Sequence, residues 1–196
     1  MPILPIYVYD QPVLRRRAKP VRGIDGALTK LTEDMFETMH SANGIGLAAN
    51  QVGSLQRIVV VDLSVTEEWK DTKPLVLLNP EVVRQEGEVT MEEGCLSLPD
   101  IRDEVDRAET ITVRFLDLEF RQQELTASGL LARVCMHEID HLNGVLFFDH
   151  LGPLKRKLLN GRLNRLKNGD MEVDYPVVGA IYVPADPAVP KGPPSE

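Results

Sequence analysis

The chain has 196 residues, of which 43% are hydrophobic, and its 22 Lys and Arg residues against 30 Asp and Glu residues give a formal net charge of -8. A chain of this length can bury one good core, and the acidic balance argues against a surface built mainly to bind DNA or anionic lipid. Because we find neither a signal-peptide pattern nor a membrane-spanning stretch, we expect a cytoplasmic protein with no membrane partner.

The first half of the chain predicts an arm, a helix and several strands. Residues 1–24 combine prolines with an arginine run and predict an extended arm over the domain surface. Apolar residues then recur at helical spacing until Asn43-Gly44, which predicts a first helix from about residue 25. The β-rich runs at 57–62 and 75–78 and the alternating pattern at 110–117 predict strands.

Two more helices are predicted in the second half. Residues 128–144 are mostly apolar, with Ser128 as a candidate N-cap and Gly144 as a stop, so this helix should lie inside the core. After Pro153 a leucine stripe alternates with basic residues and predicts a basic amphipathic helix. Its members are Leu154, Leu158, Leu159, Leu163 and Leu166, with Lys155, Arg156, Lys157, Arg162, Arg165 and Lys167. We expect one domain over residues 1–182 and a proline-rich mobile tail over 183–196.

The central helix contains an HExxH sequence, His137-Glu138-Ile139-Asp140-His141. Two histidines four positions apart on a helix turn both imidazoles to one side, within reach of one metal ion. Glu138 directly follows the first of them and could take a proton from a water molecule at the site. A pair of ordinary core histidines is the alternative interpretation, because five residues are a modest signal.

A catalytic site of this kind usually needs a third protein ligand. Cys135 points away from the histidines by the helical period and is better interpreted as a core residue. Cys95 follows Gly94, which permits close backbone approach, and could reach the helix from a separate segment. A thiolate with two imidazoles suits zinc or ferrous iron.

Three segments resemble the three motifs of the peptide deformylase family, in the family's order. They are residues 44–51 (GIGLAANQ), 93–97 (EGCLS) and 137–142 (HEIDHL). The resemblance implies a metal-dependent hydrolase that removes the N-formyl group from the N-terminal formyl-methionine of nascent proteins and releases formate. It also fits an α+β fold, with mostly antiparallel strands packed around the HExxH helix and an amphipathic C-terminal helix.

The same resemblance assigns roles to individual residues. It implies three metal ligands, namely Cys95, His137 and His141, with water in the fourth position. Glu138 becomes the acid and base, while the backbone N–H of Leu96 and the side-chain amide of Gln51 meet the charge on the formyl oxygen. One divalent ion is implied, Fe(II) natively, with Zn, Ni or Co as substitutes.

Further residues are implied to contact the formylated peptide. The backbone of Ile45 and Gly46 would pair with it as an added strand, beside Gly94. Arg102 matches a family arginine near the cleft mouth, although a solvated loop arginine fits equally. Two residues depart from the expected pattern: Met136 stands where Gln is usual, and Arg133 stands where an apolar pocket lining is expected, so its head group should either point outward or alter the side-chain preference.

Other interpretations compete with this one. A zinc endopeptidase would explain the HExxH sequence alone, and a structural metal module or inactive binding protein would need a closed metal site. Asp140 could orient a metal ligand, or could simply face solvent on the helix. The basic C-terminal helix is either a solvated face or, by the resemblance, a ribosome contact.

Overall fold

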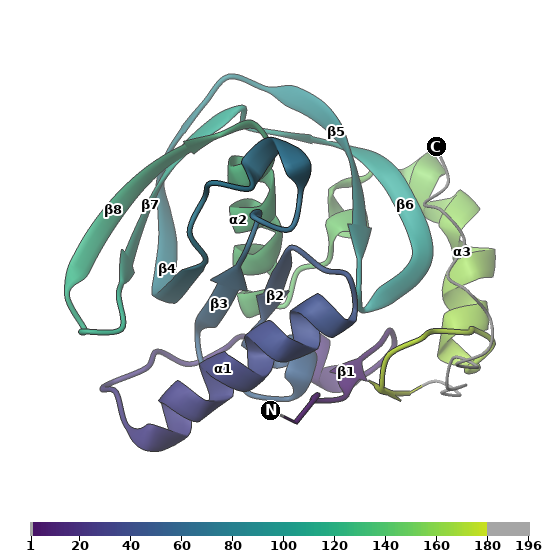
Figure 1. Ribbon diagram of the computed structural model, residues 1–196. Helices are drawn as coiled ribbons and strands as arrows, with labels where there is room; N and C mark the ends of the chain where they lie inside the picture. Colours follow the sequence, from purple (N-terminus) through teal and green to yellow (C-terminus); the bar gives the residue numbers. More distant parts are fainter. Residues whose placement is uncertain (1, 180–196) are drawn as a thin grey trace.

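The helix with the HExxH sequence, α2 (Gly129–Leu142), lies in the middle of the molecule, between a sheet and a hairpin (Figure 1). The computed structural model describes residues 2–179, so the tail predicted at 183–196 lies outside the described residues. The other helices are α1 (Gly26–Ser41) and α3 (Pro153–Lys167), and α3 packs outside the hairpin. Short 3-10 helices η1 to η4 cover Pro12–Arg15, Ala49–Val52, Glu67–Trp69 and Phe147–His150.

The main sheet has five strands in the order β2-β3-β4-β7-β8. These strands are Gly46–Ala48, Ile58–Val61, Leu75–Glu86, Thr110–Leu116 and Gln122–Ser128, and all neighbours are antiparallel. Strands β5 (Val89–Cys95) and β6 (Leu98–Arg107) form a separate antiparallel hairpin, and β1 (Ile6–Tyr7) pairs in parallel with β9 (Val177–Val178). The predicted α+β class with mostly antiparallel strands is therefore confirmed.

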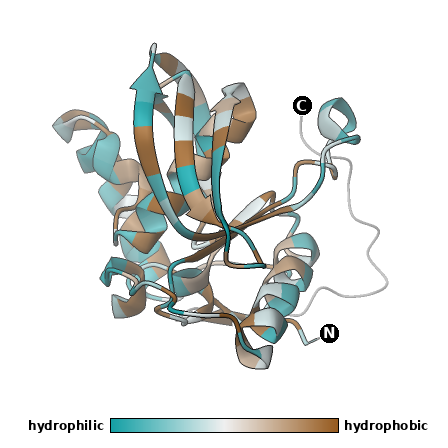
Figure 2. Ribbon diagram, turned by 90° about the vertical axis from the view of Figure 1, so that its left-hand side faces the viewer, coloured by the Kyte–Doolittle hydropathy of each residue, from teal (hydrophilic) through white to brown (hydrophobic). Residues whose placement is uncertain are grey.

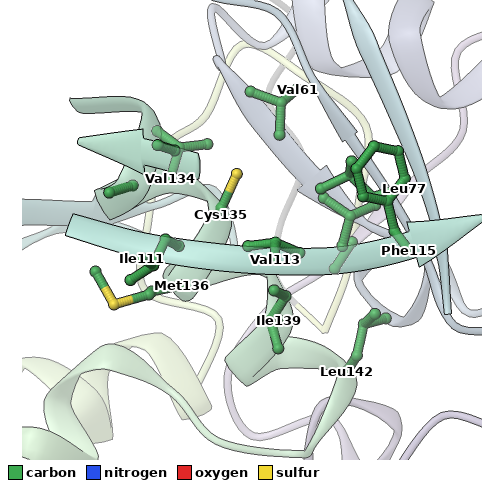
Figure 3. Packing of buried hydrophobic residues seen from close by; sticks show 14 of the residues in the cluster. Val61, Leu77, Ile111, Val113, Phe115, Val134, Cys135, Met136, Ile139 and Leu142 are labelled. Atoms are coloured by element: carbon green, nitrogen blue, oxygen red, sulfur yellow. The ribbon is translucent and has the colours of Figure 1, made fainter. Parts of the chain in front are cut away.

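The core lies between α2 and the main sheet. Apolar and polar residues alternate along the long strands, so each strand presents one apolar face (Figure 2). Cys135 and Ile139 of α2 pack among sheet residues such as Val61, Leu77 and Val113 (Figure 3). Cys135 is fully buried, which confirms its interpretation as a core residue.

Two predictions in the first half were wrong in part. Residues 1–24 do not simply lie on the surface, because Ile6 and Val8 are fully buried, and Ile6 pairs with Val177 of β9. The strand predicted at 75–78 continues to Glu86, although Pro80 stands only two positions after Leu78. An irregularity in the β4–β7 register between Leu78 and Glu81 accommodates this proline, because a proline can occupy a bulge without breaking the strand.

The second half also departs from prediction in two places. Ser128 occupies the N-cap position of α2 but forms no capping bond, and its hydroxyl contacts that of Thr110 instead, at 2.8 Å. In α3 the three later leucines are buried, whereas Leu154 and Leu158 are each 73% exposed. The five leucines therefore do not form one buried stripe, because Leu159, Leu163 and Leu166 lie at helical spacing on the packed face, whereas Leu154 and Leu158 lie on another.

Candidate metal centre

Cys95, His137 and His141 converge at the end of the β5–β6 hairpin. Their potential ligand atoms all lie within 4.8 Å of one another, and the sulfur of Cys95 is 3.1 Å from Nε2 of His141. The two histidines are one helical turn apart on α2, as their spacing predicted. Cys95 ends β5, where a register shift between Gly94 and Cys95 turns the chain toward α2.

Glu93 fixes the orientation of the His137 ring. Its Oε2 accepts a hydrogen bond from Nδ1 of His137 at 2.8 Å, which leaves Nε2 of the ring directed toward the cluster. Burial raises the pKa of Glu93, but hydrogen bonds from His137 and Arg107 outweigh this effect and hold the pKa well below its usual range. Glu93 is therefore a carboxylate that supports His137 from behind.

The electrostatics of the two histidines differ. Burial lowers the pKa of His141, and the neighbouring charge on His137 lowers it further, so this imidazole is neutral. Burial also lowers the pKa of His137, but hydrogen bonds with Cys95 and Glu93 and the charges of Cys95 and Glu138 raise it well above the usual value. A cysteine sulfur and two imidazoles whose ligand atoms already converge are a donor set that fits a zinc-like or ferrous ion.

Glu138 lies beside the cluster with one oxygen unsatisfied. The residue is 4% exposed, and its Oε2 has no hydrogen-bond partner among residues 2–179. Burial raises the pKa of this carboxyl to about 7, the charge on His137 lowers it, and the charge on Glu93 raises it again. Such a group can accept and release a proton near neutral pH, which is the requirement for a general base and acid.

Gln51 and Leu96 both lie next to Cys95, although they belong to different sequence motifs. The amide nitrogen of Gln51 is 3.6 Å from the sulfur of Cys95 and 3.2 Å from the hydroxyl of Ser97. Its Oε1 accepts the N–H of Ala48 at 2.8 Å, so the side chain is held with its NH₂ toward the cluster. Leu96 directly follows Cys95, and its carbonyl accepts the hydroxyl of Tyr175 at 2.8 Å.

The β2 strand forms one edge of the main sheet and passes beside Glu138. Ile45 directs its carbonyl toward the end of β3, and it accepts the N–H of Asp62, the residue after that strand, at 3.0 Å. By the alternation of an antiparallel ladder, the polar groups of Gly46 then face the open edge. The backbone of Gly46, more than the carbonyl of Ile45, is thus available to an added strand.

Gly94 and Arg102 are paired across the hairpin. The side chain of Arg102 covers Gly94 and is 69% exposed, with a 3.5 Å ion pair to Glu92. This position is compatible with both interpretations of Arg102, as a cleft arginine and as a solvated one.

Of the two alternatives for Arg133, the outward-pointing head group is wrong. Arg133 is 4% exposed, and its guanidinium donates to Glu93 and to the carbonyls of Val105 and Val89. The Glu93 carboxylate and the two carbonyls supply charge-assisted hydrogen bonds that satisfy the guanidinium inside the protein. The head group is thus turned away from solvent and engaged with the hairpin.

Asp140 does not orient either histidine directly. Its Oδ2 accepts Nη1 of Arg107 at 2.6 Å and lies 2.7 Å from Nε2 of His150. Sequence reasoning missed Glu93, the residue that does contact His137. The available signal was the spacing of Glu93 and Cys95, which are two positions apart and would share one side of a strand, but no strand was predicted over these residues.

The fold and this cluster together define a class of protein. An α+β protein with a Cys-His-His cluster on an HExxH helix, and a buried carboxylate beside it, has the arrangement of a metallohydrolase.

Comparison with known proteins identifies the family within that class. The sequence profile of the family described as Polypeptide deformylase matches residues 3–157. A peptide deformylase from Salinibacter ruber is 48% identical over 184 residues, covering 90% of this chain and 94% of that protein. A peptide deformylase from Chlorobium phaeovibrioides is 44% identical over 178 residues, covering 91% of this chain and 94% of that protein.

Solved structures agree with the sequence comparison. The crystal structure of a peptide deformylase from Legionella pneumophila superposes with a TM-score of 0.78 at 44% identity, covering 85% of this chain and 96% of that one. The crystal structure of the plant peptide deformylase PDF1B superposes with a TM-score of 0.79 at 34% identity, covering 84% of this chain and 89% of that one. The chain therefore belongs to the polypeptide deformylase family, and the prediction of a hydrolase of this kind is confirmed.

Proposed function

We propose that this enzyme removes the N-formyl group from the formyl-methionine at the start of nascent proteins, releasing formate, with one divalent ion held by Cys95, His137 and His141. The observation that carries the proposal is the convergence of these three ligand atoms beside the buried Glu138. Three protein ligands leave a position for water, whereas a structural site usually has four. Fe(II) is the proposed native ion, with Zn, Ni or Co as substitutes.

The proposed reaction divides the chemistry between the ion and the protein. When bound, the ion supplies Lewis acidity to a water molecule and to the formyl oxygen. Glu138 accepts the proton of the attacking water at its carboxylate and delivers it to the departing amine nitrogen. The amide nitrogen of Gln51, directed toward Cys95, and the backbone N–H of Leu96 donate to the formyl oxygen as its negative charge develops.

The substrate peptide is proposed to bind as an extra strand along the edge of the main sheet. Strand β2 is an edge strand, and Gly46 offers a backbone without a side chain next to Glu138. Pairing there would bring the peptide's N-terminal residue to the cluster. Ile45 and Gly94 would line the same path, and Arg102 would lie at its exposed end.

A formate-release assay tests this proposal. Anaerobically purified protein, with its metal content measured on the same sample, should release formate from formyl-Met-Ala-Ser and leave acetyl-Met-Ala-Ser intact. Cleavage of blocked internal peptides without formate release would instead indicate an endopeptidase. Glu138→Gln should keep the metal and lose turnover, while Glu124→Gln, on the exposed β8 strand, should keep both.

The state of Cys95 gives an independent test of the metal. Cys95 is a free, half-buried cysteine, and with ferrous iron we expect its thiolate to be lost to oxidation in air. Activity of the iron-loaded enzyme should decline during aerobic storage, whereas the zinc-loaded enzyme should be stable. Unchanged activity of the iron form in air would contradict the proposed oxygen sensitivity.

We also propose that α3 contacts the ribosome, where the nascent substrate emerges in the cytoplasm. Exposed basic residues flank Leu154 and Leu158, which suits a surface that carries phosphates. Reversing the charges of Arg156 and Lys157 to Glu should reduce co-sedimentation with ribosomes, whereas the same change at Arg22 and Lys73 should not. Equal co-sedimentation of both variants would contradict the contact. No helix within residues 2–179 is long and apolar enough to cross a membrane.

A further inference from the structure

Arg133 is a buried cation that the proposed chemistry does not use. It lies on α2 one turn before His137, with its guanidinium enclosed between the helix and the β5–β6 hairpin. We propose that Arg133 is a positioning residue, which holds Glu93 and the hairpin so that the His137 ring is directed at Cys95. The inference rests on the proposed function, because it takes His137 and Cys95 as metal ligands.

Glu93 is held by four donors from three side chains. Its Oε1 accepts Nη1 of Arg133 at 2.8 Å and Nε of Arg107 at 2.6 Å. Its Oε2 accepts Nδ1 of His137 at 2.8 Å and Nη2 of Arg107 at 3.1 Å. The carboxylate cannot turn without breaking a charge-assisted bond, so its direction fixes the direction of the imidazole.

Arg133 also joins the helix to the backbone of the hairpin. Its Nη1 donates to the carbonyl of Val105 on β6 at 2.8 Å, and its Nη2 donates to that of Val89 on β5 at 2.7 Å. The same hairpin carries Glu93 and Cys95, while α2 carries Arg133 and both histidines. Arg133 therefore bonds to both strands of the element that carries the sulfur, from the helix that carries the imidazoles.

Arg107 alone would not replace this function, because it is shared. Arg107 binds Glu93 and also donates Nη1 to Asp140 at 2.6 Å. With Arg133 present, two guanidinium groups face two carboxylates. Without it, one buried cation would face both Glu93 and Asp140, and Oε1 of Glu93 would lose its bond from α2, so the carboxylate would be held less firmly against His137.

The metal affinity of an Arg133→Met variant tests the inference. Methionine keeps an unbranched apolar stem but removes the charge and all three donated bonds. We expect the affinity for Co(II), measured on the apo-protein against a competing chelator, to fall about 10- to 100-fold. The visible absorption of the bound Co(II) should change as well, because the spectrum reports ligand geometry.

A matched control separates positioning from general stability. Arg57 also joins α2 to a strand through carbonyls, donating to Leu142 at 3.3 Å and Pro80 at 3.1 Å, but it does not contact Glu93. Arg57→Met should lower the melting temperature yet leave Co(II) affinity and spectrum within about twofold of the parent protein. If Arg133→Met does the same, Arg133 is only structural and the inference is overturned.

Two further variants keep the test decisive. If Arg133→Met does not fold, Arg133→Lys, which restores the charge but not the paired carbonyl bonds, should still show weakened Co(II) binding. Glu93→Gln should weaken Co(II) binding too. The Glu93→Gln/Arg133→Met double variant should bind Co(II) only slightly more weakly than the single variant with the lower affinity, because both changes act on His137. Additive losses would overturn the inference.

These outcomes are distinguishable from failure of the proposed function. Parent protein that binds Co(II) but releases no formate contradicts the deformylation chemistry and leaves the Arg133 comparison intact. Parent protein that releases formate, with metal affinity unchanged by Arg133→Met and Arg133→Lys, overturns only the positioning role.

Discussion

Gly46 and Glu138 approach each other so closely that a Cβ atom at position 46 would lie 2.7 Å from Oε1 of Glu138. The same atom would lie 2.7 Å from Cγ1 of Val134, so the added methyl group would have little room on either side. Gly46→Ala should therefore displace the Glu138 carboxylate while leaving the Cys-His-His cluster in place. We expect kcat/KM for formate release to fall at least about tenfold, because misplacement of a catalytic group costs more than its small movement suggests.

The control for this prediction is Gly26→Ala at the start of α1, where an added Cβ would meet no atom within 4 Å. That variant should keep full activity. Metal content should be unchanged in both variants. A Gly46→Ala protein with normal kcat/KM would show that the close approach is not needed for the position of Glu138.

Asp62 should stabilise the fold only while it is ionised. Its Oδ1 accepts the N–H and hydroxyl of Ser64 at 2.9 and 2.6 Å, and its Oδ2 lies 2.8 Å from Nε2 of His40. Burial raises the pKa of Asp62, but these hydrogen bonds outweigh it and place the pKa below the usual value. The carboxylate therefore contributes stability at pH values above its pKa in the unfolded chain, which is about 3.9. That contribution is lost as the pH falls through its lower pKa in the folded protein.

Urea unfolding of an Asp62→Asn variant measures this contribution. We expect a loss of about 1–2 kcal/mol at about pH 7 that shrinks below about pH 4. The exposed Asp71→Asn variant should stay within about 0.5 kcal/mol of the parent throughout. A loss from Asp62→Asn that is the same at every pH would contradict the assigned cause.

Two glycine-to-alanine changes should affect stability in opposite directions. Gly161 lies within α3, and a Cβ there would meet nothing within 4 Å, so Gly161→Ala should raise the free energy of unfolding by about 0.5–1 kcal/mol. Gly144 has a φ of +77°, and a Cβ there would lie 2.5 Å from the carbonyl oxygen of Arg15. Gly144→Ala should lower stability by more than about 1 kcal/mol. Urea denaturation of both variants checks the signs.

The features that sequence could predict are those set by local periodicity. The spacing of His137 and His141 places both rings on one side of a helix whatever surrounds it, and the structure has them one turn apart on α2. The apolar face of α1 and the alternation along β7 are equally local. These patterns identify elements, but they do not identify which elements meet.

The contacts that sequence could not predict join distant segments. Arg133 meets Glu93 across 40 positions, so an arginine in an apolar helix gave no indication of its partner. The length of β4 was hidden by Pro80, because only the three-dimensional register shows that the proline sits at an irregularity. In α3 the pattern showed five leucines but not how much of the helix the protein covers.

The α3 leucines therefore provide a direct test of which side of this helix is packed. Leu163 is 5% exposed and lies in the cluster that includes Phe147 and Ile101, whereas Leu158 is 73% exposed. Leu163→Ala should lower the free energy of unfolding by about 2–4 kcal/mol, because it removes buried methyl groups and leaves a cavity. Leu158→Ala should change it by no more than about 0.5 kcal/mol, because alanine is also a good helix former and little packing is lost. Both values come from urea denaturation of the same protein, and comparable losses at the two positions would show that Leu158 is covered in solution by a further contact.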